Sequence, residues 1–196
     1  MANNISSLVV DHLCDEPGEE NIAIAGFYCD FRDQYEQTTT NIMGAILKQL
    51  VVREEVLEHV KTAFNKAKMK VGGRGLRLPD MVAMLKQAVT ILPRVFICLD
   101  ALDECLPKHL PELLRALEDI LQGSPRMRIF VTGRPHVEAE IKRRFTTAVI
   151  VPISPNTHDI KRFLENKLEM DTEQDAMPDN LRADILRIIP ERISEV

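Results

Sequence analysis

The chain has 196 residues, of which 45% are hydrophobic and 28% charged, as in ordinary globular proteins with a substantial core. Its net charge of −5 argues against a general nucleic-acid binder, and no apolar stretch approaches the ~20 residues that span a membrane. The first residues lack the basic start and cleavage site of a signal peptide. The 4 cysteines have no metal-ligand spacing, so we expect a cytoplasmic protein with reduced thiols.

The first part of the chain predicts one strand and several helices. Ile5–Leu13 has helical spacing of apolar residues, and Asn21–Tyr28 has the apolar character of a strand. Capping residues and apolar stripes predict three further helices, over Thr38–Val52, Glu54–Lys66 and Pro79–Leu92. The basic segment Lys68–Arg77 contains glycines, but no strand leads into it and no Gly-Lys-Ser/Thr closes it. We therefore interpret it as a surface loop rather than a phosphate-binding loop.

The stretch Arg94–Glu104 carries the strongest chemical signal. Val95–Leu99 is an unbroken apolar run, typical of a parallel strand that is buried on both faces. It ends on Asp100, and Asp103 and Glu104 follow within one helical turn. Carboxylates this close repel one another by about 1 kcal/mol or more per pair, so we expect a positive charge beside them. A Mg²⁺ ion bound by one carboxylate and by nucleotide phosphates would supply this charge. The position agrees, because ligands of parallel sheets bind at the carboxyl ends of the strands.

The rest of the chain adds two strands and then only helices. A helix is predicted over Pro107–Gln122, a buried strand over Arg128–Thr132, a short helix over Val137–Phe145 and a last strand over Ala148–Ile153. Two more helices follow, Thr157–Leu168 and Asn180–Ile189. The alternation predicts an α/β fold, a parallel sheet flanked by helices, over residues 1–154, and the beginning of a helical domain over residues 155–196.

The segment Leu-Asp-Ala-Leu-Asp-Glu-Cys after an apolar strand resembles the Walker B segment of the NACHT family. These are signalling P-loop NTPases of the STAND class, and the version here is similar to fungal proteins with ankyrin or WD repeats. The resemblance implies ATP or GTP with Mg²⁺ as cofactors and a conformational switch driven by hydrolysis. Asp100 would bind the metal, and Asp103 or Glu104 would orient the attacking water. The sequence does not separate these last two.

A second segment, the strand at Arg128–Thr132 followed by Gly133-Arg134-Pro135, resembles the Sensor 1 segment of the same family. By this resemblance Thr132 or Arg134 would lie near the γ-phosphate, where an arginine offsets negative charge. The alternative is that Arg134 pairs with the carboxylates or caps the end of the strand. The residues alone leave both possibilities open.

The phosphate-binding loop of the family is missing from the sequence, which contains no Gly-x-x-x-x-Gly-Lys-Ser/Thr. By resemblance the first strand and this loop would precede the helix at Ile5, and the missing strand would lie between the Arg128 strand and the last strand. Its absence would leave two unpaired strand edges, which invite pairing with another chain. We therefore expect an N-terminally truncated NACHT domain that is impaired in nucleotide binding.

Three functions are compatible with these observations. The first is a NACHT-type signalling NTPase domain or its remnant, and the second is a non-catalytic scaffold or interaction module derived from one. A weaker third is a metal-dependent hydrolase that uses Asp100, Asp103 and Glu104 as a cation cage. The expected partners are nucleotide and other proteins or further copies of the chain, with neither nucleic acid nor membrane.

Overall fold

Residues 2–15, 22–52, 54–70, 76–154, 156–170 and 177–193 are described by a computed structural model, which divides into two units, Met1–Ala148 and Val149–Val196. The helices and strands of the first unit are, in chain order, α1 (Ala2–Asp15), β1 (Ile22–Tyr28), η1 (Phe31–Asp33), α2 (Thr39–Leu50), α3 (Glu54–Lys70), α4 (Leu78–Ile91), β2 (Arg94–Asp100), η2 (Leu102–Glu104), α5 (Leu110–Gln122), β3 (Met127–Val131), η3 (Pro135–Val137) and α6 (Glu138–Arg144). Those of the second unit are α7 (Thr157–Glu169) and α8 (Asp179–Ile193). The domain boundary at residue 154 stays a prediction. Of the loop predicted over Lys68–Arg77, residues 71–75 lie outside the described part of the chain.

The sheet of the first unit has three parallel strands in the order β1-β2-β3, which confirms the predicted α/β class with a parallel sheet. β2 is the central strand, and Tyr28 at the end of β1 lies opposite Asp100 at the end of β2. Val95, Ile97 and Leu99 of β2 are fully buried. The strand is buried because helices cover both faces of the sheet, as the unbroken apolar run predicts.

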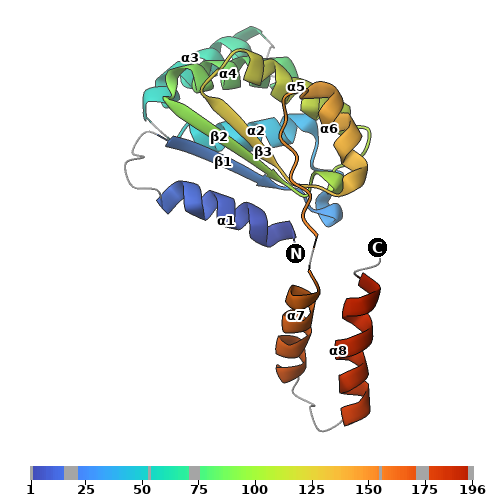
Figure 1. The fold of residues 1–196 in the computed structure, drawn as a ribbon. Helices are drawn as coiled ribbons and strands as arrows, with labels where there is room; N and C mark the ends of the chain where they lie inside the picture. Colours follow the sequence, from blue (N-terminus) through green and yellow to red (C-terminus); the bar gives the residue numbers. More distant parts are fainter. Residues whose placement is uncertain are drawn as a thin grey trace. The chain divides into compact units, whose positions relative to one another are not determined.

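The helices of the first unit form two layers around the sheet. α1 lies along one side of the sheet, and α3, α4 and α5 lie on the other side (Figure 1). The apolar stripe of α5 shows why this helix packs there, since four of its six buried residues are fully buried, Leu113, Leu114, Leu117 and Ile120. Among the described residues, no helix combines the length and the apolar character needed to cross a membrane.

The two edge strands of the sheet differ in how their outer backbone groups are satisfied. On β1 the side-chain amide of Gln49 from α2 pairs with Gly26, accepting from its N–H (2.9 Å) and donating to its C=O (2.8 Å). A side chain that occupies these groups hinders the pairing of another strand with this edge. On β3, within the described part of the chain, no strand pairs with the edge that faces away from β2.

The prediction of a last strand over Ala148–Ile153 is wrong. This segment has no strand structure, and Val149, Val151 and Ile153 are largely exposed. A strand requires a partner for its backbone hydrogen bonds, and in the described residues none pairs with this segment. Pro152 also lacks the N–H that a ladder needs. The two helices predicted after it are present as α7 and α8, which pack against each other (Figure 1).

The turn after β2 directs the chain back over the end of the sheet. Ala101 has φ 52° and ψ 51°, in the left-handed region. Its N–H donates to the hydroxyl of Thr132 (3.0 Å), and the N–H of Leu102 donates to the C=O of Thr132 (2.9 Å). The turn therefore holds η2, with its acidic residues Asp103 and Glu104, at the carboxyl ends of β2 and β3. Residues 101–104 are called the acidic turn below.

The conformation of Ala101 leads to a prediction about stability. Ala101→Gly should raise the free energy of unfolding by up to about 1 kcal/mol, because glycine adopts this conformation without the cost of about 1–2 kcal/mol that other residues carry. Ala101→Val should lower it by about 2 kcal/mol or more, because a β-branched side chain is strongly disfavoured at positive φ and residue 101 is buried. Urea denaturation of the two variants measures both changes. A valine variant as stable as the unmodified chain would contradict the left-handed turn.

Candidate functional site

Asp100 is the centre of the candidate site, at the carboxyl end of β2. Its residue is 1% exposed. Its Oδ1 atom accepts hydrogen bonds from the hydroxyls of Ser6 on α1 and of Thr132 after β3, the latter at 2.6 Å. Its Oδ2 atom is buried and has no hydrogen-bond partner in the described part of the chain. The carboxylate is thus held firmly by one oxygen, while the other is unpaired.

This arrangement fits a Mg²⁺ ion whose remaining coordination positions are filled by water and a bound ligand. A buried carboxylate oxygen without a partner is costly unless something positive satisfies it. Mg²⁺ commonly binds one or two carboxylates, with water and phosphate oxygens filling the remaining positions. No group of three or more His, Cys, Asp or Glu side chains able to hold a metal is found in the described residues, which include Asp100, Asp103 and Glu104. The geometry therefore does not support the cation cage of a metal-dependent hydrolase.

Sequence reasoning missed Ser6 as a site residue. Ser6 is buried, and it precedes its partner Asp100 by 94 positions in the sequence. A signal for it was available, because the phosphate-loop motif ends with a Ser or Thr at the start of the following helix, and that hydroxyl binds Mg²⁺. Ser6 lies near the start of α1, but without the glycines and lysine of the motif no residue pattern around it indicates a site.

Thr132 and Arg134, predicted to lie near the γ-phosphate, both contact acidic residues, and their place beside a phosphate stays a prediction. Thr132 donates to Asp100 and accepts from the N–H of Ala101, so it orients the carboxylate and fixes the turn. Arg134 binds Asp103 twice, through its backbone N–H (3.1 Å) and through Nε (3.2 Å). The Arg134 side chain is 76% exposed and that of Asp103 only 9%, so this ion pair stabilises by no more than about 1 kcal/mol. The pairing of Arg134 with a carboxylate, one of the two possibilities left open, is therefore present, and the γ-phosphate contact stays a prediction.

Gly133 lies against Val137 of η3. A Cβ atom built on Gly133 would lie 2.8 Å from Cγ2 of Val137 and 3.6–3.7 Å from Oδ1 and N of Asp103. A side chain at this position would therefore clash with Val137, so that the Val137 side chain would have to move. The distances to Asp103 are ordinary van der Waals contacts.

Glu104 faces the end of β1 rather than Arg134. Its Oε2 atom accepts from the backbone N–H of Phe31 in η1 (2.9 Å). The structure therefore gives the two acids of η2 different neighbours, because both Asp103 oxygens contact Arg134 and one Glu104 oxygen holds the segment after β1.

A pair of cysteines lies beside the acidic turn. The sulfur atoms of Cys29, which follows β1, and Cys105, which follows η2, are 3.1 Å apart, and both residues are buried. The hydrogen bond with Cys105, together with burial, raises the pKa of Cys29, and the same hydrogen bond lowers the pKa of Cys105. Burial raises the pKa of Cys98 in β2 to about 11.

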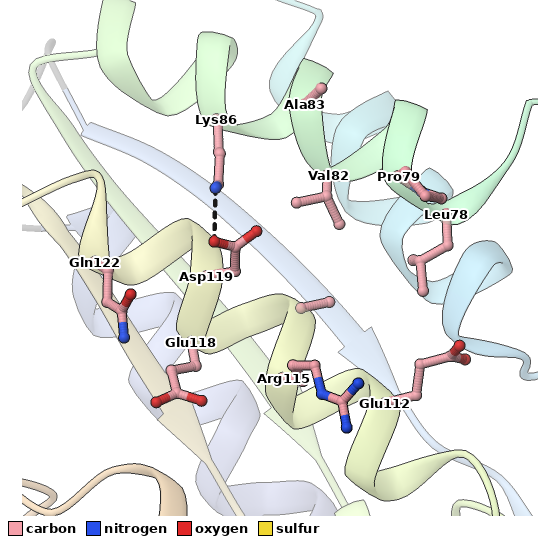
Figure 2. A pocket seen from close by; sticks show the side chains of 11 residues that line it. Leu78, Pro79, Val82, Ala83, Lys86, Glu112, Arg115, Glu118, Asp119 and Gln122 are labelled. Carbon is pink, nitrogen blue, oxygen red and sulfur yellow. Dashed lines mark hydrogen bonds and ion pairs between the residues drawn. The ribbon is translucent and has the colours of Figure 1, made fainter.

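A groove of about 640 Å³ runs between α4 and α5, and the ion pair of Lys86 and Asp119 (2.7 Å) crosses it (Figure 2). Leu78, Val82 and Ala116 are among its apolar lining residues. None of the predicted site residues lines it, so the groove is separate from the acidic turn.

Comparison with known proteins yields a family and a structural likeness. The Walker-type ATPase PABY2304 of Pyrococcus abyssi is similar to this chain with a TM-score of 0.41 and 12% identity, over 98% of this chain and 70% of that one. No curated protein matches. The profile of the family described as "Nephrocystin 3, N-terminal" matches residues 4–134, which include most of α1, the whole sheet and the acidic turn. The chain therefore belongs to the nephrocystin-3 N-terminal family.

Proposed function

We propose that the first unit is a nucleotide-binding, NTPase-like domain of the NACHT type, in which nucleoside triphosphate and Mg²⁺ bind at the carboxyl ends of the strands. The observation that carries the proposal is the contact between Ser6 and Asp100. P-loop NTPases hold Mg²⁺ with these two groups, a hydroxyl at the start of a helix and an aspartate at the end of a buried strand. The unpaired Oδ2 atom of Asp100 supports the same assignment.

In this proposal each residue of the site has a separate role. Mg²⁺, when bound, neutralises charge on the β- and γ-phosphates. Asp100 and Ser6 hold the metal, and Thr132 is a positioning residue that keeps the carboxylate oriented. We assign the orientation of the attacking water to Glu104, because both oxygens of Asp103 are engaged by Arg134. Arg134 would offset phosphate charge only after leaving Asp103.

The absence of a phosphate-loop motif from these 196 residues sets the expected affinity. In P-loop NTPases the backbone N–H groups and the lysine of that loop hold the β- and γ-phosphates. Without these groups we expect weak binding, and hydrolysis that is slow or absent in this chain taken alone.

Nucleotide binding gives the direct test. Titration of the chain with fluorescent ATP and GTP analogues should show saturable binding that requires Mg²⁺ and is lost with EDTA. Asp100→Asn and Ser6→Ala should each weaken it about tenfold or more, because each removes a group that holds the metal. Asp119→Asn is the matched control, because it makes the same charge change at a surface ion pair outside the site. Equal affinity for the Asp100 and Asp119 variants would contradict the proposal.

The alternative function is a non-catalytic interaction module, favoured by the edge of β3 that pairs with no strand in the described part of the chain. Such an edge can accept a strand from another protein or from a second copy of the chain. No nucleotide binding at ~1 mM, equivalent to a binding free energy weaker than about −4 kcal/mol, would favour this module over the switch.

Stability measurements separate the roles of Asp100 and Thr132. In metal-free buffer Asp100→Asn should raise the free energy of unfolding by about 1 kcal/mol, because the loss of a buried charge outweighs the cost of leaving the amide N–H groups unpaired at the position of Oδ2. Thr132→Val should lower it by about 1–2 kcal/mol, because Asp100 and Ala101 each lose a hydrogen bond. Urea denaturation measures both. A less stable asparagine variant would mean that Asp100 serves the fold rather than a cation.

A further inference from the structure

We propose that Cys29 and Cys105 form a redox-active dithiol, which hydrogen peroxide converts to an intramolecular disulfide. The two residues are 76 positions apart in sequence, and their sulfur atoms lie 3.1 Å apart. Both are free thiols in the structure. The proposal concerns an oxidation site and does not depend on nucleotide binding.

The backbone holds the two cysteines in place. The N–H of Cys29 donates to the C=O of Asp100 (3.0 Å), and the N–H of Cys105 donates to the C=O of Leu102 (3.3 Å). A disulfide bond is about 2.05 Å long, so the sulfur atoms need to approach by roughly 1 Å, which small side-chain rotations can supply. Because one backbone segment is anchored to the end of β2 and the other to η2, which follows it closely, the thiols stay close together in the reduced protein.

The two cysteines are almost completely buried, so a small oxidant should reach them more readily than a bulky one. Cys29 is 6% exposed and Cys105 is 4% exposed, so neither is completely sealed from solvent. Hydrogen peroxide is small and uncharged, whereas bulky disulfide reagents would need the surrounding segment to open.

The chemistry balances with peroxide as the electron acceptor. One cysteine, as the thiolate, attacks a peroxide oxygen, the O–O bond breaks, and the departing hydroxide takes a proton to become water. The resulting sulfenic acid is attacked by the sulfur of the second cysteine, which forms the S–S bond and releases a second water. Two thiols and one peroxide thus give one disulfide and two waters, and two electrons pass from sulfur to oxygen.

The cross-link would join the end of β1 to the end of the acidic turn. Residue 29 directly follows β1 and residue 105 directly follows η2. Closing a loop between positions 76 apart restricts the unfolded chain, so oxidation should raise the melting temperature by about 5–10 °C.

Peptide mapping tests the proposal. The full chain and a Cys14→Ser, Cys98→Ser double variant, which keeps only the proposed pair, are treated with peroxide, alkylated and digested without reduction. Mass spectrometry should show a Cys29–Cys105 linked peptide in both proteins, with the loss of two hydrogen atoms. The melting temperature should rise and should return after dithiothreitol.

A triple variant that adds Cys29→Ser is the matched control. Its remaining thiol, Cys105, should stop at a sulfenic acid that dimedone traps, and its melting temperature should not rise. Persistence of both thiols in the unmodified chain, or a disulfide that joins other cysteines or two chains, would overturn the proposal. Because this result comes from the unmodified chain, a variant that fails to fold does not affect it.

Discussion

The hydrogen bonds to Oδ1 of Asp100 connect three parts of the chain that are far apart in sequence. Ser6 reaches this oxygen from α1, and Thr132 reaches it from the end of β3. The carboxylate lies almost completely out of water, and its second oxygen has no partner in the described residues. A buried carboxylate oxygen without a partner lowers the free energy of unfolding, and a bound cation would raise it again.

The acidic turn depends on the same region. The left-handed conformation of Ala101 reverses the chain immediately after Asp100, and two hydrogen bonds to Thr132 hold the reversal. Thr132 therefore holds the carboxylate with its hydroxyl and the turn with both its hydroxyl and its backbone C=O. Because Thr132 has both roles, the positions of Asp103 and Glu104 are coupled to the position of Asp100.

The carboxyl ends of the three strands gather chemically different groups in one area. Asp103 pairs with Arg134, Glu104 holds the backbone of Phe31, and Cys29 contacts Cys105. Each contact joins the acidic turn to the segment that follows β1 or β3. Movement of this turn would therefore disturb contacts at the ends of both neighbouring strands.

The sequence by itself determined the class of the fold and most of its elements. The unbroken apolar run Val95–Leu99 predicted the central strand, and the leucine stripe of α5 predicted a helix against the sheet, because burial and periodicity are local properties. Asp100 was also identified from its place at the end of that run. Only the tertiary structure decided that Ser6 contacts Asp100, that Arg134 binds Asp103 and that Ala148–Ile153 forms no strand. Each of these depends on a partner distant in the chain, and no local pattern of residues specifies whether that partner is in reach.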